Sequence, residues 1–111
     1  MIGKSLISLA LLGVLMSVNA KEVVIDLRTP AEIAETGIVQ GAVAVNFKAP
    51  DFAERLEALN LKSDDEIYAY CRTGRRVGLS LPVFEDLGLK NVTNLGGYER
   101  AARMLGRPLV K

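Results

Sequence analysis

Cys71 is the residue of this sequence whose type and surroundings best suit catalysis. The chain contains one cysteine and no histidine in 111 residues. The thiolate is the nucleophilic form of cysteine, so a catalytic cysteine needs surroundings that favour the anion. The lack of histidine excludes Ser-His-Asp and Cys-His catalysis, and also metal sites built on imidazole or clustered thiolates. We therefore predict no metal site and no cofactor, and we expect Cys71 to be activated without a histidine base.

The segment after Cys71 predicts a loop that binds anions. It consists of Arg72, Thr73, Gly74, Arg75 and Arg76. A helix is predicted to follow, and the free N–H groups and dipole at a helix N-terminus favour negative charge. Gly74 lets the loop curl so that backbone amides surround a sulfur atom, while the arginines add positive charge. The segment therefore suits attack by Cys71 on a small anionic sulfur or phosphorus donor.

A structural role is the alternative for these residues. Lone cysteines that follow an apolar strand are more often inert core residues than nucleophiles. A core cysteine does not need the sequence Arg-Thr-Gly-Arg-Arg after it, which favours the catalytic interpretation. Arg72 and Arg75 fit a solvated helix face equally well, whereas Arg76 is better placed because it closes the loop at the helix start.

The elements that would position Cys71 follow from the apolar pattern. Runs rich in β-branched residues predict strands over residues 23–27, 42–47, 66–70 and 92–95. A first helix is predicted between Thr29 and Gly37, and it begins with a capping box. Further helices are predicted over residues 51–59, over about a dozen residues that end at 87–88, and over residues 98–105. Pro82 lies inside the third helix, and an interior proline costs about 3 kcal/mol. That helix is predicted to be kinked or broken near Leu81.

Alternating strands and helices predict an α/β fold, with an open, mostly parallel sheet and helices on both faces. Ligands of such sheets bind beyond the carboxyl ends of the strands. Cys71 lies at one such end, and Asp26 and Arg28 lie at another. We therefore expect these three residues to lie near the same edge of the sheet.

Residues 1–20 are predicted to be a cleaved secretory signal peptide. Lys4 precedes an apolar stretch over residues 5–18, and small residues precede Lys21. The stretch is shorter than the roughly 20 residues that span a bilayer, so we expect cleavage and no stable membrane anchor. Residues 21–111 are then a single domain, exported to a bacterial periplasm. With 14 Lys and Arg against 13 Asp and Glu, the chain has no basic excess, and we predict no nucleic-acid partner.

The mature sequence resembles the rhodanese family, and specifically its small periplasmic thiosulfate sulfurtransferases of the phage-shock-protein E type. The resemblance covers nearly all of residues 21–111. Its motifs, in order, are Asp26-Leu27-Arg28-Thr29-Pro30-Ala31-Glu32, Gly41-Ala42 with Val45-Asn46, Cys71-Arg72-Thr73-Gly74-Arg75-Arg76, and Asn94-Leu95-Gly96-Gly97-Tyr98. Each motif is weak alone, but four in this order are specific.

The resemblance implies an α/β enzyme that transfers sulfur in two half-reactions. The Cys71 thiolate would attack thiosulfate, release sulfite and hold the sulfur as a persulfide, which a thiophilic acceptor such as cyanide or a thiol then takes. By the same resemblance, the amides of residues 72–76 bind the persulfide, and Asp26 and Arg28 support the loop. The sequence leaves the physiological acceptor and the oligomeric state open, with a monomer as our expectation.

The sequence departs from the family pattern at three positions. Ile38 stands where a histidine is common, and Ala101 stands where an aromatic residue is often found after the Gly-Gly turn. Pro82 in the helix after the loop is the third. Neither Ile38 nor Ala101 supplies the nucleophile, so we expect these changes to affect the pocket edge rather than the chemistry.

Three other functions compete with sulfur transfer. Tyrosine phosphatases and arsenate reductases also use a cysteine and an anion-binding loop, but the phosphatase arginine would fall at Val77 here, and Arg76 comes one residue too early. A non-catalytic rhodanese-like binding module would tend to lack the cysteine. A thiol-disulfide oxidoreductase would need a partner thiol from another molecule, because the chain has no C-x-x-C motif.

Overall fold

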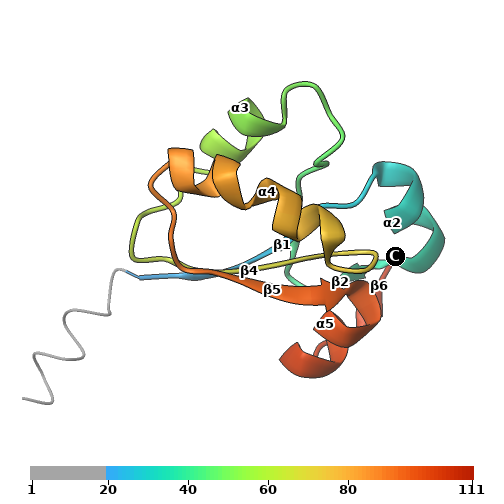
Figure 1. Cartoon of the computed structure of the whole chain (residues 1–111). Coiled ribbons are helices and arrows are strands. Elements are labelled where there is room, and N and C mark those ends of the chain that lie inside the picture. Colours follow the sequence, from blue (N-terminus) through green and yellow to red (C-terminus); the bar gives the residue numbers. More distant parts are fainter. Residues whose placement is uncertain (1–19) are drawn as a thin grey trace, which may run out of the picture.

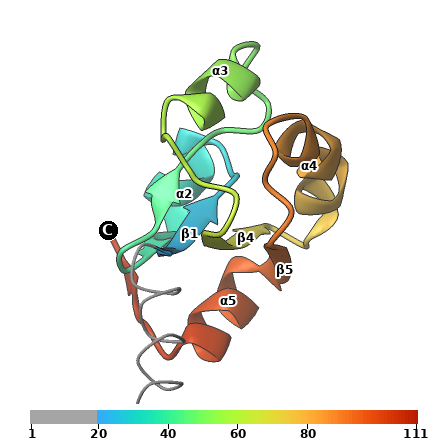
Figure 2. The same cartoon turned by 90° about the vertical axis from the view of Figure 1, so that its left-hand side faces the viewer.

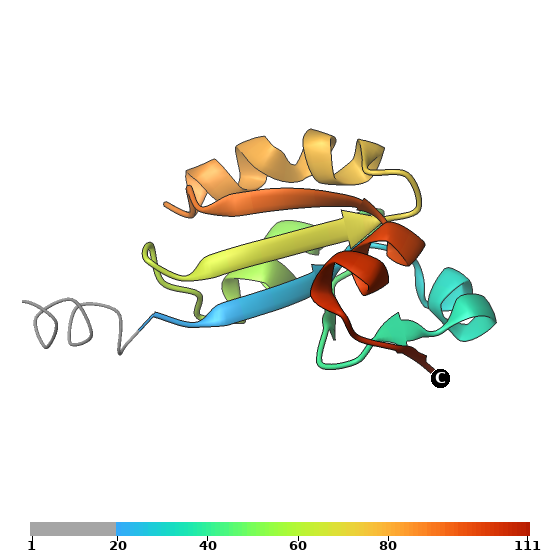
Figure 3. The same ribbon diagram turned by 90° about the horizontal axis from the view of Figure 1, so that it is seen from below.

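The computed structural model describes residues 20–111, so almost all of the predicted signal peptide lies outside the described residues. A parallel sheet forms the centre of the domain, with strand order β3-β1-β4-β5. Its strands are β1 (Glu22–Asp26), β3 (Val43–Ala44), β4 (Glu66–Cys71) and β5 (Val92–Gly97). In Figure 3, β1, β4 and β5 run side by side and point to the same edge of the sheet. The predicted parallel α/β sheet is confirmed.

Helices cover both faces of this sheet because successive strand residues face opposite sides. One face carries Ile25, Ala69 and Cys71, and it packs against α3 (Phe52–Glu57) and α4 (Arg75–Asp86). The other face carries Val24 and Tyr70 and packs against α5 (Tyr98–Leu105). Figures 1 and 2 show α3 and α4 on one side of the sheet and α5 on the other.

Helix α2 (Pro30–Thr36) lies at the carboxyl edge of the sheet, close to the loop after β4 (Figure 3). Its first turn has the predicted capping box. The Glu32 N–H donates to Thr29 Oγ1 at 3.3 Å, and the Thr29 N–H donates to Glu32 Oε1 at 3.0 Å. Two backbone donors at the helix start are thereby satisfied, and Pro30 occupies the first position, where it costs no hydrogen bond.

Two features differ from the sequence-based prediction. A small antiparallel sheet joins β2 (Ile38–Val39) to β6 (Leu109–Val110), and neither strand was predicted. Strand β3 is shorter than the predicted strand over residues 42–47. Beyond β3, the Val45 N–H still donates to the Asp26 carbonyl at 2.9 Å, and the Phe47 N–H donates to the Leu27 carbonyl at 3.0 Å. Two-residue strands carry too little periodicity to be recognised in a sequence.

Helix α4 is continuous from Arg75 to Asp86 with Pro82 inside it. We predicted a kink or a break near Leu81, and the break does not occur. Val77 and Phe84, on either side of the proline, are completely buried against the sheet. Burying a large apolar side chain contributes about 1.5–3 kcal/mol, so two of them outweigh the hydrogen bond that the proline removes.

Within residues 20–111, no helix is both long enough and apolar enough to cross a membrane.

Candidate active site

Cys71 is the last residue of β4, and its side chain lies beneath the loop that follows. The side chain is 1% exposed and packs in the core under α4. The backbone N–H of Gly74 donates to Cys71 Sγ, with 3.0 Å between nitrogen and sulfur. A backbone donor aimed at the sulfur stabilises negative charge there, and α4 begins one residue later. The predicted arrangement of strand, cysteine, loop and helix N-terminus is therefore present.

The loop is held in shape by β5 as well as by α4. Gly74 has φ of +97°, which favours glycine, and it is the N-cap of α4. Asn94 Nδ2 donates to the Gly74 carbonyl at 2.9 Å, while Asn94 Oδ1 accepts the Gly96 N–H at 2.9 Å. One amide side chain therefore links the loop after Cys71 to the end of the neighbouring strand.

Gly97 allows this close approach between strand and loop. It pairs with Cys71 across a register shift between β4 and β5. A Cβ at Gly97 would lie 2.5 Å from the Arg72 carbonyl oxygen, a separation that real Cβ atoms do not show. Any other residue at this position would therefore push the loop away from β5. The sequence motif contained Gly97 without revealing which contact requires it.

Arg76 forms a bidentate ion pair with Glu32 of α2. Its Nη1 and Nη2 each donate to one carboxylate oxygen of Glu32 at 2.8 Å. The hydrogen bonds from Arg76, and further bonds from Thr29, lower the pKa of Glu32 to about 2. The same pairing raises the pKa of Arg76. The Arg76 side chain therefore fastens the loop to α2, and it makes no hydrogen bond to the Cys71 sulfur within residues 20–111.

Asp26 and Arg28 form a buried ion pair that holds the other end of α2. Arg28 Nη2 donates to Asp26 Oδ2 at 2.7 Å and to the Gly37 carbonyl at 2.8 Å, and Nη1 donates to Thr36 Oγ1 at 2.6 Å. Burial alone would lower the pKa of Arg28, but the bonds and charge of Asp26 outweigh it and raise that pKa. Among the described residues, this pair makes no hydrogen bond to the loop. Its connection to the loop runs through α2.

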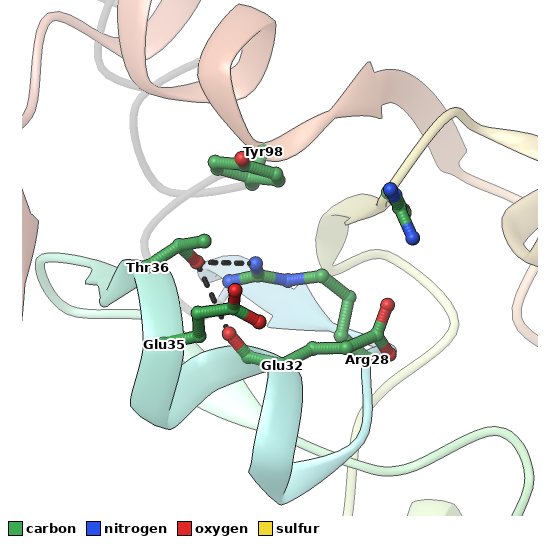
Figure 4. Close-up of a pocket in the computed structure, with 6 residues that line it drawn as sticks. Arg28, Glu32, Glu35, Thr36 and Tyr98 are labelled. Carbon is green, nitrogen blue, oxygen red and sulfur yellow. Dashed lines mark hydrogen bonds between the residues drawn. The ribbon is translucent and has the colours of Figure 1, made fainter.

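A pocket of about 120 Å³ opens beside the loop at the carboxyl edge of the sheet. It is lined by Arg28, Glu32, Glu35, Thr36, Arg72 and Tyr98. Figure 4 shows the Arg28 guanidinium between Tyr98 on one side and helix α2 on the other. The guanidinium carbon lies 4.4 Å from the centre of the Tyr98 ring, a cation–π contact.

Only some of the residues predicted for the site lie at the sulfur or in the pocket. Cys71 and Gly74 meet at the sulfur, and Arg28 and Arg72 line the same pocket. Thr73 and Arg75 are exposed, and no side-chain hydrogen bond or ion pair of theirs occurs in the described part of the chain. Ile38 and Ala101 do not line the pocket; Ala101 is completely buried in the core beside β5, and Tyr98 is the aromatic residue of the pocket. Our expectation that these two departures change the pocket edge has no support in this geometry.

Sequence reasoning did not assign roles to Glu32, Asn94 or Tyr98. Glu32 was recognised only as part of the capping box, and the other two only as motif residues. Each acts on a residue far away in the sequence, so no local pattern could have revealed its contact. Across residues 20–111, no three side chains of the metal-ligating types gather into a possible metal site.

Comparison with known proteins gives a consistent result. The profile of the family described as Rhodanese-like domain matches residues 14–103. A solved structure described as rhodanese with anions from E. coli is 30% identical, with a TM-score of 0.66, and the match covers 81% of this chain and 98% of that chain.

Two further solved structures have the same fold. A rhodanese-related protein from Thermoplasma volcanium is 22% identical, with a TM-score of 0.60, over 87% of this chain and 90% of that one. A protein of unknown function from Rhodopseudomonas palustris, described as a possible tyrosine phosphatase, is 25% identical, with a TM-score of 0.58, over 88% of this chain and 77% of that one. None of the curated proteins compared matches the chain. The family match spans most of the sequence, and the chain belongs to the rhodanese-like domain family.

Proposed function

We propose that this protein is a thiosulfate sulfurtransferase that carries sulfur as a persulfide on Cys71. Membership of the family and the rhodanese from E. coli support sulfurtransferase chemistry in general. The observation that carries the proposal is the Gly74 N–H that donates to Cys71 Sγ at 3.0 Å, at the start of α4. A sulfur held by a backbone donor is suited to bear negative charge, which the reaction requires at each step.

The first half-reaction forms one S–S bond and breaks another. The Cys71 thiolate attacks the outer sulfur of thiosulfate, and the electron pair of the old S–S bond leaves with sulfite. The products are the Cys71 persulfide anion and a sulfite dianion, so atoms and charge balance. Because the thiol is 1% exposed, the loop over it must shift for the donor to reach the sulfur. In the second half-reaction, a thiophilic acceptor removes the outer sulfur and restores the thiolate.

A cysteine-dependent phosphatase is the alternative that one comparison favours, because the related Rhodopseudomonas palustris protein is described as a possible tyrosine phosphatase. The loop of this chain argues against it. A phosphatase arginine would bind the equatorial phosphoryl oxygens, but both terminal guanidinium nitrogens of Arg76 donate to Glu32 at 2.8 Å. A non-catalytic binding module is less consistent with a cysteine that receives a backbone hydrogen bond.

A mass measurement tests the proposed chemistry. Purified protein incubated with thiosulfate should gain the mass of one sulfur atom at Cys71 and lose it when cyanide is added. Because the chain has one cysteine, the Cys71→Ser variant should show neither change. Hydrolysis of an aryl phosphate without any sulfur gain would instead favour the phosphatase. No reaction with either substrate would favour the binding module.

The proposal includes export to a bacterial periplasm, as in the phage-shock-protein E type of this family. Its support is the sequence of residues 1–20, where a positive residue, an apolar stretch and small residues occur in the order of a signal peptide. The mature domain would then begin at Lys21 and act as a monomer on small anionic donors.

A further inference from the structure

Two charged side chains in the pocket beside Cys71 have no partner in residues 20–111. Arg28 is engaged by Asp26, Thr36 and Gly37, and both oxygens of Glu32 are engaged by Arg76. Glu35 and Arg72 line the same pocket and are exposed, and neither makes a hydrogen bond or ion pair within the described chain. The pocket therefore offers one carboxylate and one guanidinium to a ligand.

These two charges come from different elements. Glu35 lies on α2, which faces Tyr98 across the Arg28 guanidinium (Figure 4). Arg72 directly follows Cys71 in the chain, so it belongs to the loop that covers the sulfur. A ligand between them would meet a negative group on one wall and a positive group on the other. Complementary charge of this kind selects a ligand that carries both an ammonium and a carboxylate.

Glu35 is poorly suited to the proposed donor. Thiosulfate is a dianion, and a carboxylate that faces it opposes its binding. Arg28 and Glu32 are each engaged in an ion pair, so the unpaired charges of this pocket are Glu35, which disfavours a dianion, and Arg72, which favours one. The place of Glu35 on the pocket wall is therefore better explained by the second substrate than by the first.

We propose that the sulfur acceptor is a small zwitterionic thiol of the cysteine type, whose ammonium binds Glu35 and whose carboxylate binds Arg72. This inference rests on the proposed sulfurtransferase function. The pocket volume of about 120 Å³ suits a ligand of this size.

The transfer step balances without any further reagent. The acceptor thiolate attacks the outer sulfur of the Cys71 persulfide and forms a new S–S bond. The bond between Cys71 Sγ and the outer sulfur breaks, and its electron pair stays on Sγ. The products are the free persulfide of the acceptor and the Cys71 thiolate, ready for a second donor.

Acceptors of different charge test this assignment. Protein loaded with sulfur from thiosulfate and freed of excess donor is mixed with L-cysteine, cysteamine, 3-mercaptopropionate or cyanide, and the loss of persulfide is timed. Glu35→Gln should slow transfer to the two ammonium-bearing thiols about fivefold, as expected for an exposed ion pair of about 1 kcal/mol. It should not slow transfer to 3-mercaptopropionate or cyanide. Ratios of variant to wild-type rates cancel the different reactivities of the thiols.

Two further variants complete the comparison. Arg72→Gln should slow transfer to 3-mercaptopropionate, which carries a carboxylate, more than transfer to cysteamine, which carries only an ammonium. The ratio of the two rates measures this change. Glu57→Gln changes an exposed carboxylate of α3 that does not line this pocket, and it should alter none of the ratios. An equal slowing with all four acceptors in Glu35→Gln would indicate a structural role and overturn the proposal, as would no slowing at all.

A binding measurement separates this inference from the proposed function. L-serine has the same ammonium and carboxylate without the thiol, so its binding does not depend on sulfur chemistry. Titration of L-serine into the unloaded protein, followed by NMR, should shift the signals of Glu35, Arg72 and Tyr98, and Glu35→Gln should weaken the binding. Unchanged spectra would overturn the acceptor assignment. Normal L-serine binding by a protein that gains no sulfur from thiosulfate would overturn the proposed function, and with it the acceptor role, but not the site for an ammonium and a carboxylate.

Discussion

Cys71 is held mainly by the backbone and not by the arginines that surround it in the sequence. One N–H, from Gly74, points at its sulfur, while Arg72 and Arg75 are exposed and Arg76 is bound to Glu32. The arginines therefore differ: Arg76 fixes the loop to α2, Arg72 borders the pocket, and Arg75 makes no side-chain hydrogen bond or ion pair within residues 20–111. From the sequence, Arg72 and Arg75 fitted a solvated helix face as well as a role at the thiol, and Arg76 was the better placed of the three.

The Glu32–Arg76 ion pair predicts a pH-dependent stability. The pKa of Glu32 is lowered to about 2, chiefly by its hydrogen bonds with Arg76. A carboxyl group with a lowered pKa stabilises the fold at pH values above its unfolded-state pKa, which is about 4.3 for glutamate. This stabilisation is lost as the pH falls towards 2. Glu32→Gln should therefore reduce the free energy of unfolding by about 1 kcal/mol at pH 7, because solvent screens a partly exposed pair.

Urea unfolding of wild type and Glu32→Gln between pH 7 and pH 2 checks this prediction. The part of the difference in the free energy of unfolding that comes from ionisation should shrink below about pH 4.3 and be mostly lost by about pH 2. Glutamine can keep the capping hydrogen bond at this helix position, but it loses the negative charge and one of the two acceptors for Arg76. Glu57→Gln, on an exposed face of α3, serves as the control. A difference that stays constant across the whole pH range would contradict the assigned ion pair.

At the scale of elements, the sheet and the two helices at its carboxyl edge set the position of the loop. Strand β4 delivers Cys71, β5 holds the loop through Asn94, and α2 holds it through Glu32. The opposite ends of β1 and β4 are joined by Asp65. Its Oδ1 accepts the Lys21 N–H at 2.9 Å, and its Oδ2 accepts the Lys62 N–H at 2.8 Å.

Asp65→Asn should destabilise the sheet at this end. The carboxylate is buried, and an amide can accept at only one of the two positions, so one of these backbone donors loses its acceptor. The hydrogen bonds from Lys62 and Lys21 lower the pKa of Asp65, so its contribution is present at neutral pH and is lost on acidification. We expect a lower urea midpoint for Asp65→Asn at pH 7.

The neighbouring Asp64 provides a matched control for this substitution. Asp64 is exposed and makes no side-chain hydrogen bond in the part of the chain that the structure describes. Asp64→Asn should therefore leave the urea midpoint almost unchanged. Equal midpoints for the two variants would show that Asp65 does not hold the two strands together.

At the scale of the whole molecule, the start of the domain lies at the end of the sheet opposite to the active site. Lys21 precedes β1 at its amino end, whereas Cys71 ends β4 (Figure 3). If cleavage follows Ala20, as proposed, the new amino group of Lys21 lies 2.9 Å from the Asp65 carboxylate and forms an ion pair with it.

Export predicts a defined N-terminus. The full-length chain expressed in a bacterium should be recovered in the periplasmic fraction, and N-terminal sequencing should begin at Lys21. The physical reason is that the apolar stretch over residues 5–18 is too short to remain as a spanning helix, whereas the small residues before Lys21 suit a signal peptidase. Recovery in the cytoplasm with Met1 retained would contradict the proposed location.

The sequence by itself predicted most of what depends on local pattern. Apolar alternation located the strands of the central sheet, and turn and capping residues located the helices between them. Cys71, Gly74 and their place before α4 followed from a contiguous segment of the chain. These features are predictable because hydrophobic periodicity and helix capping act over a few residues.

Only the tertiary structure decided which residues support the site. Glu32 and Arg76 are 44 positions apart, and Asn94 and Gly74 are 20 apart, so neither pair leaves a local pattern. The requirement for Gly97 depends on how closely β5 approaches the Arg72 carbonyl. Continuity of α4 through Pro82 depends on the burial of Val77 and Phe84 against the sheet. Each outcome is set by distances between segments that meet only on folding, and a one-dimensional sequence does not contain those distances.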